Sequence, residues 1–136
     1  ADAELMRVLA ELGADPKRPN ADQSTPLMAA AGLGTRSPGE DAGTEDEVLE
    51  AIELALALGN DINAVDKNGE TAMHGAAYKN YPKAVLLLAA KGADPAVWNK
   101  PNQRGWTPLT IARGYRFGNF KPSAVTVAAF EKLGVR

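Results

Sequence analysis

Apolar residues recur at helical spacing in short blocks of this chain, and helix-breaking residues separate the blocks. The clearest block follows Pro82, where Ala84, Val85, Leu87 and Leu88 form one apolar stripe. A proline fits the first turn of a helix because its missing N–H would have no partner there. The pattern therefore predicts a short helix that begins at this proline and buries one face.

A shorter, alanine-rich helix is predicted just before it, from Met73 to Lys79. Thr71 is a candidate N-cap, since its hydroxyl can accept a hydrogen bond from the first helical turn. Residues 75–77 are small, which indicates a neighbouring helix that passes close. Gly92 is expected to end the second helix in the left-handed conformation. Turn, helix, turn, helix and loop thus make one unit.

Two phrases recur in register, which indicates that this unit repeats. The first phrase occurs as Thr25-Pro26-Leu27-Met28, Thr71-Ala72-Met73-His74 and Thr107-Pro108-Leu109-Thr110. The second occurs as Gly13-Ala14-Asp15-Pro16, Gly59-Asn60-Asp61-Ile62-Asn63 and Gly92-Ala93-Asp94-Pro95. Gly59 and Gly92 are 33 residues apart, which is the period of one class of helical repeat. Such units bury a continuous core only by stacking on their neighbours.

These phrases resemble the ankyrin repeat. In that family Thr-Pro-Leu-His opens the inner helix, Val-x-x-Leu-Leu packs the outer helix, and Gly-Ala-Asp leads into a β-hairpin-like loop. Residues 71–74, 85–88 and 92–94 stand at these places. The resemblance covers nearly the whole chain and implies an all-α solenoid of stacked helix-turn-helix units with β-hairpin-like loops.

The chain is predicted to form one domain over residues 1–136. We expect a partial first repeat at 1–20, a second at 21–65 with an insert near 35–46, a third at 66–99 and a C-terminal capping repeat at 100–136. The insert is inferred because Thr25 and Thr71 are 46 residues apart, about 13 more than one period. The first inner helix is missing, so we expect the chain to be a piece of a longer protein.

Several boundaries follow from local signals. Thr44 and Glu47 are spaced as a capping box, which predicts an outer helix over roughly 45–58. Asp94-Pro95 is expected to begin a turn, and a last helix over 123–133 is expected to cap the stack. Three aromatic residues of the last third are predicted to seal the end of the core: Trp98, Phe117 and Phe120.

Composition narrows the class of protein. Hydrophobic residues make up 45% of the chain and charged residues 24%, which is typical of a globular domain. The net charge of -2 gives no basic surplus for nucleic acid. The apolar runs are far shorter than the about 20 residues that span a bilayer. The absence of cysteine excludes disulfides and thiol chemistry but fits a cytoplasmic, periplasmic or secreted location alike.

No catalytic constellation emerges. His74 is the only histidine, and we expect it to bond backbone near a hairpin rather than act as a base or metal ligand. The acidic run over 40–47 lacks the spacing of a calcium loop, and its carboxylates suit a helix start. The glycines near 29–34 lack the Lys-Ser/Thr of a phosphate loop. We therefore expect no enzyme activity, no metal and no cofactor.

The resemblance implies a concave surface, made of hairpin tips and inner helices, that faces a ligand. Carried over position by position, it nominates twelve residues: Asp22, Ser24, Leu33, Lys67, Asn68, Glu70, Tyr78, Lys79, Gln103, Arg104, Trp106 and Tyr115. Exposed Trp, Tyr and Arg are enriched at binding hot spots. The insert would start at the end of an inner helix and flank this strip.

The leading hypothesis is a monomeric, non-catalytic module that binds another protein through this strip. A structural or regulatory segment of a larger enzyme or receptor, in contact with its own chain, is the alternative. An engineered binder is disfavoured because the copies are uneven, whereas designed repeats approach a consensus. A natural sequence of bacterial type fits better.

Overall fold

The computed structural model describes residues 17–33, 44–116 and 120–135, together with residues 7, 11, 13 and 15. In these residues the secondary structure is helical, without strands, which confirms the all-α prediction. The helices are α2 (Pro26–Ala31), α3 (Glu45–Ala57), α4 (Ala72–Lys79), α5 (Pro82–Ala90), α6 (Pro95–Trp98), α7 (Pro108–Ala112) and α8 (Ala124–Lys132). The insert over 35–43, most of the expected first helix and Phe117 lie outside the described residues.

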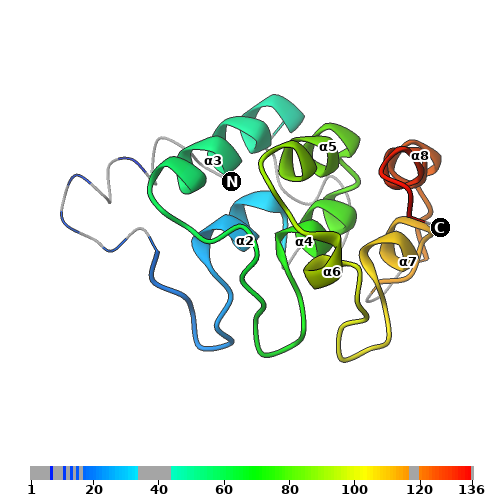
Figure 1. The fold of residues 1–136 in the computed structure, drawn as a ribbon, viewed down its shortest axis with the longest axis horizontal. Helices are drawn as coiled ribbons and strands as arrows, with labels where there is room; N and C mark the ends of the chain where they lie inside the picture. Colours follow the sequence, from blue (N-terminus) through cyan, green and yellow to red (C-terminus); the bar gives the residue numbers. More distant parts are fainter. Residues whose placement is uncertain are drawn as a thin grey trace.

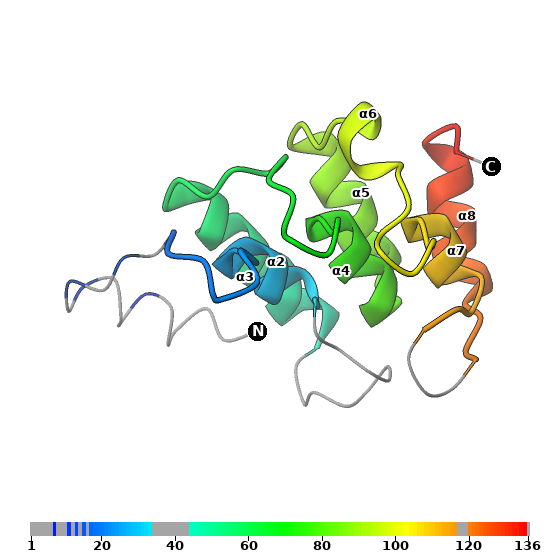
Figure 2. The ribbon, with the colours of Figure 1, turned by 90° about the horizontal axis from the view of Figure 1, so that it is seen from below.

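The helices form two layers (Figure 1). Within the units, α2 packs on α3, α4 on α5, and α7 on α8. Between the units, α2, α4 and α7 stack in the inner layer, and α3, α5 and α8 stack in the outer layer. Figure 2 looks onto the loops, which lie over the row of inner helices.

Threonine hydroxyls cap the starts of α2, α3 and α7. Thr71 is the N-cap of α4, as predicted, but the bond seen there runs from its own N–H to Nδ1 of His74 at 3.1 Å. Oγ1 of Thr25 accepts from the N–H of Met28 at 3.2 Å, and Oγ1 of Thr107 accepts from that of Thr110 at 3.1 Å. Thr44 caps α3 through the N–H of Glu47 at 3.1 Å. In a capping box the Glu47 carboxylate would accept from the backbone N–H of Thr44. Here it accepts from the Thr44 hydroxyl instead, at 3.3 Å.

The helix ends also follow the sequence signals. Gly92 follows α5 with a φ of 106°, and the N–H of Ala93 returns to the carbonyl of Leu88 at 3.0 Å. This bond satisfies a carbonyl that the helix itself leaves free. The left-handed end predicted at Gly92 is therefore confirmed.

The short helix α6 is a correction, since a turn was expected at Asp94-Pro95. Asp94 accepts from the N–H of Ala96 at 2.9 Å, and Pro95 occupies the first helical position. This pair is a helix-start signal as much as a turn signal. The helix carries Trp98 into the core, where its ring centroid lies 5.6 Å from that of Phe130.

The aromatic residues predicted to seal the end of the core differ in their burial. Trp98 is 2% exposed, which confirms its place in the core. Phe120 is 64% exposed, so the prediction for it was wrong. Its ring instead lies against Gly114 and meets the exposed ring of Tyr115, so it stays at the surface.

The inner helices α2 and α4 approach closely at two glycines, as the small residues predicted. A Cβ atom on Gly75 would lie 2.7 Å from the backbone nitrogen of Leu33. A Cβ atom on Gly32 would lie 2.6 Å from the carbonyl oxygen of Gly75. Neither position has room for a side chain.

Gln23 offers a stabilising substitution. It has a φ of 65° at the place where the next two hairpins have Gly69 and Gly105, with φ of 75° and 83°. Because a non-glycine residue is strained in this region, we expect Gln23→Gly to raise the free energy of unfolding by about 0.5–1 kcal/mol. Urea denaturation of both proteins would measure the change. Gly105→Ala should show the opposite sign, and a Gln23→Gly protein no more stable than the parent would contradict the strain.

Candidate functional site

The three hairpin tips share one device. A side-chain oxygen of Asn20, Asp66 or Asn102 accepts the N–H groups of the residues two and four positions later, at 2.9–3.1 Å. Each lies five residues before the threonine of its repeat phrase. This role was not predicted from the sequence, although the constant spacing of an Asn or Asp was a signal that could have revealed it.

Hydrogen bonds join the tips into one edge. The N–H of Lys67 donates to the carbonyl of Asp22 at 2.8 Å, and the N–H of Gln103 donates to that of Asn68 at 2.9 Å. The hydroxyl of Ser24 also donates to Oδ2 of Asp66 at 2.8 Å. The loops are therefore held as a preorganised surface beside the inner helices.

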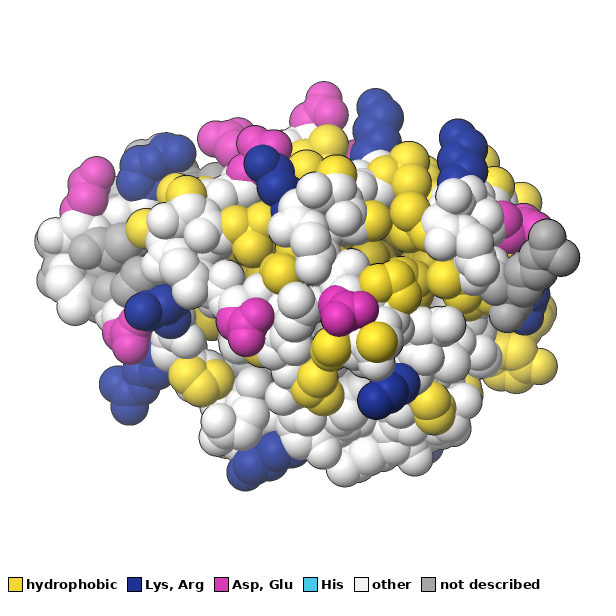
Figure 3. All heavy atoms as spheres, viewed as in Figure 1, with side chains coloured by type: hydrophobic (Ala, Val, Ile, Leu, Met, Phe, Trp, Pro, Cys, Tyr) yellow, Lys and Arg dark blue, Asp and Glu magenta, His cyan; other side chains and the backbone are white. Residues whose placement is uncertain are grey.

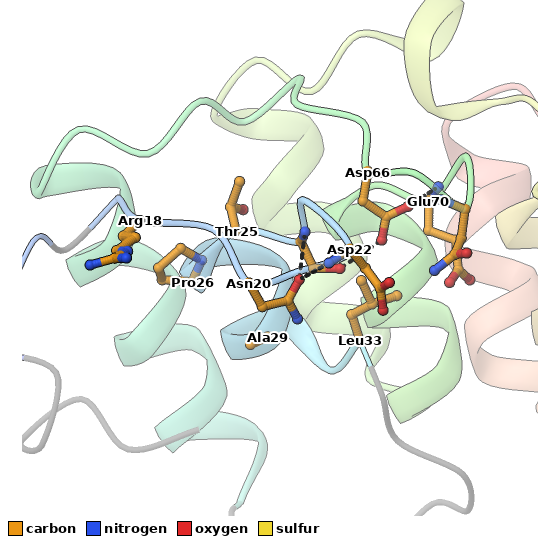
Figure 4. A pocket seen from close by; sticks show the side chains of 11 residues that line it. Arg18, Asn20, Asp22, Thr25, Pro26, Ala29, Leu33, Asp66 and Glu70 are labelled. Carbon is orange, nitrogen blue, oxygen red and sulfur yellow. Dashed lines mark hydrogen bonds between the residues drawn. The ribbon is translucent and has the colours of Figure 1, made fainter.

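A pocket of about 340 Å³ opens between the first two tips and α2 (Figure 4). It brings together five of the nominated residues: Asp22, Ser24, Leu33, Asn68 and Glu70. The remaining lining residues were not nominated: Arg18, Asn20, Thr25, Pro26, Ala29 and Asp66. The pocket thus combines polar hairpin atoms with an apolar wall from α2.

The pocket is acidic. Its lining holds three carboxylates, from Asp22, Asp66 and Glu70, against the one guanidinium of Arg18. Asp66 is buried, and it bonds to Ser24 and to its own loop. Burial raises the pKa of Glu70, and the nearby charge of Asp66 adds to this, although hydrogen bonds from Asn102 and Tyr78 oppose it. The exposed Asp22 leaves its charge facing solvent.

Other nominated residues lie along the same edge. Lys67, Gln103 and Arg104 are exposed at the tips, and Trp106 is partly buried against the core. Tyr115 is 52% exposed, and its ring meets that of Phe120 edge-on with centroids 5.4 Å apart.

The structure corrects the expected exposure of two nominated residues. Tyr78 is 4% exposed and Lys79 is 3% exposed, so neither is presented to solvent in this structure. The Tyr78 hydroxyl accepts from the Asn102 amide at 3.4 Å, and Lys79 lies over the Tyr81 ring at 5.9 Å. These neighbours, Asn102 and Tyr81, follow α4 in the sequence. The position of a residue within α4 therefore does not predict its burial by them.

Arg116 belongs to the same buried region and was missed. Its guanidinium donates to the carbonyl of Tyr78 at 2.7 Å and lies 5.9 Å from the Tyr78 ring. A cation at the C-terminal end of α4 complements the helix dipole. Burial lowers the pKa of Arg116, and it raises the pKa of the Tyr78 hydroxyl beside Glu70.

His74 connects α4 to the next loop. Its Nδ1 accepts from the N–H of Thr71 at 3.1 Å, and its Nε2 lies 3.1 Å from the carbonyl of Lys100. The bond to backbone near a hairpin is therefore confirmed. Burial lowers the pKa of His74 to about 4, so the ring is neutral at pH 7 with its proton on Nε2.

In the part of the chain that the structure describes, no group of three His, Asp or Glu side chains is arranged to hold a metal ion. None of the described helices is long and apolar enough to cross a membrane.

Comparison with known proteins agrees with this geometry. A family model for ankyrin repeats in three copies matches residues 42–120. Oxysterol-binding protein-related protein 1 of Mus musculus is 43% identical over 54 residues, or 40% of this chain and 5% of that protein. An ankyrin repeat domain-containing protein of monkeypox virus is 38% identical over 65 residues, or 48% of this chain and 9% of that protein. Inversin of Gallus gallus is 31% identical over 106 residues, or 71% of this chain and 9% of that protein.

The chain spans less than a tenth of the length of these relatives. The likeness is therefore to a short segment of each relative. The family match covers more than half of the present chain, and ankyrin repeats are generically protein-binding modules. The chain belongs to the ankyrin-repeat family.

Proposed function

We propose that this domain binds a partner protein, without chemistry, through the surface of hairpin tips and inner helices. The observation that carries the proposal is the pocket beside α2, which gathers five residues nominated from the sequence. Its walls are held by hydrogen bonds between neighbouring tips, so little ordering is required on binding.

The chemistry of the pocket favours a lysine or arginine side chain of the partner. Such side chains lay an apolar stem along apolar surface and place a charged head among polar groups. Pro26, Ala29 and Leu33 offer the apolar wall, and the three carboxylates offer the opposite charge. The rest of the strip, up to Tyr115, would contact the partner on either side of this anchor.

Truncation of the aromatic residues tests the proposal. We expect the double variant Trp106→Ala/Tyr115→Ala to lose about 2 kcal/mol of partner affinity if the two side chains are hot spots. The partner is first captured from a lysate of the source organism with the domain as bait. Its affinity for wild-type and variant domains is then measured by calorimetry.

Two charge reversals serve as the matched pair for this test. Asp22→Lys changes an exposed side chain of the pocket and should also weaken capture, whereas Glu131→Lys changes an exposed side chain of α8, in the outer layer, and should not. Circular dichroism confirms that each variant is folded. Equal affinity of all four proteins would refute binding through this surface.

A further inference from the structure

The outer layer carries a second hollow, on the helices away from the hairpin tips. A groove of about 600 Å³ runs between α3 and α5, and its floor is formed by Leu49, Leu86 and Leu87. All three leucines are partly exposed although they contact the core. In Figure 3 hydrophobic surface lies along the upper part of the molecule, over these helices, beside acidic side chains.

One wall of the groove is acidic. Asp46, Glu50 and Glu53 of α3 line it at positions i, i+4 and i+7, so they lie along one side of the helix. All three side chains are exposed. Among the described residues none of these carboxylates has a hydrogen-bond or ion-pair partner. Lys83 is the single cation of the lining.

The stability of α3 alone explains only part of this row of acidic residues. A carboxylate in the first turn, such as Asp46, is favoured by the helix dipole. That benefit ends within the first turn, so it does not reach Glu50 or Glu53. Like charges three or four residues apart destabilise a helix slightly. The continued acidic row therefore costs stability in the free domain, and a bound cation would remove that cost.

The groove is also built with fixed walls. The N–H of Lys83, in the first turn of α5, donates to Oε2 of Glu45, in the first turn of α3, at 2.9 Å. This bond joins the N-terminal ends of the two helices. The helices also pack on each other along the groove. A ligand would therefore meet a preformed surface.

We propose that this groove binds a basic amphipathic helix of a partner protein. Leucine-like side chains at helical spacing would cover the floor, and Lys or Arg side chains on one flank would meet Asp46, Glu50 and Glu53. The row spans seven residues, or about 10 Å of helix, so a partner of three to four turns would engage all of it. The site lies in the layer opposite the hairpin strip, so the two surfaces can be occupied together.

The test uses two synthetic helical peptides with the same leucine positions, one with lysine and one with glutamate on the flank. We expect the lysine peptide to bind, by fluorescence anisotropy, and to shift the amide NMR signals of Leu49, Leu86 and Leu87. Glu50→Lys/Glu53→Lys should weaken binding by about tenfold or more, since two charge contacts become repulsions. Both positions are exposed, and Glu131→Lys on α8 is the matched control.

Each other outcome would overturn the proposal. Equal binding of both peptides, or equal binding by Glu50→Lys/Glu53→Lys, would show that charge does not select the occupant. Shifts confined to the hairpin tips would place the peptide on the other surface. If the NMR signals of the three leucines shift when the protein concentration is raised without any peptide, the occupant of the groove is a second copy of the chain. The Trp106→Ala/Tyr115→Ala variant should bind the lysine peptide normally, which separates this result from that of the proposed function.

Discussion

Replacing Gly75 by valine is expected to destabilise the domain by about 3 kcal/mol or more. Excess volume in a tight core costs about 1–3 kcal/mol even where side chains can move aside. Here the nearest atoms are backbone atoms of the α2 end: the nitrogen of Leu33 at 2.7 Å from the added Cβ and the oxygen of Met28 at 3.1 Å. They cannot yield without separating α2 from α4, which is the contact between two repeats.

Urea denaturation followed by Trp fluorescence would measure this effect, since Trp98 is buried. The sign of a milder variant is informative, because Gly→Ala in an open helix stabilises by about 1 kcal/mol. Gly75→Ala should instead destabilise. Ala128→Val, at an exposed position of α8, controls for the lower helix propensity of valine and should cost about 0.5 kcal/mol. A stabilised Gly75→Ala protein would refute the close approach.

The fold could be predicted from the sequence where the signal is local. Thr25, Thr71 and Thr107 mark helix starts by a chemistry that needs no distant partner, and the repeat of these phrases supplies the stacking order. Even Gly75 follows this logic, since a small residue in a helix predicts a close neighbour. The prediction of a turn at Asp94-Pro95 was wrong because the same two residues can also start a helix. Only the burial of Trp98 selects the helix over the turn.

The candidate site could be predicted in part, for the same reason. Residues at the hairpin tips, such as Asp22 and Asn68, are placed by their own loop, and the structure brings them to one pocket. Tyr78 and Lys79 depend on what packs beyond α4, and their burial follows from contacts with residues outside that helix. Arg116 bonds to a carbonyl 38 residues earlier, and no local pattern signals such a bond.

Acidification from pH 6.5 to about 4 is expected to remove about 3 kcal/mol of stability through His74. Its pKa falls from 6.5 to about 4 on folding because burial disfavours the imidazolium. In this window the unfolded chain binds a proton that the native chain does not, so the free energy of unfolding decreases as the pH falls. Each unit of pKa difference corresponds to about 1.4 kcal/mol. Protonation also places a proton on Nδ1, the atom that accepts the N–H of Thr71 in the neutral ring, so this hydrogen bond is lost.

Glu70 acts in the opposite direction, because its raised pKa lets the native state bind a proton before the unfolded chain does. The two contributions are separated by His74→Gln, which should lower stability at pH 7 but lose the steep decline between pH 6.5 and 4. Urea denaturation at several pH values gives these slopes for both proteins. The ring of the single histidine can be followed by NMR without ambiguity. A measured His74 pKa near 6.5 in the folded protein would contradict the burial of a neutral ring. A value near 4 would show that the loss of stability in acid arises at this ring, whose Nε2 contacts the carbonyl of Lys100 and so joins α4 to the third hairpin.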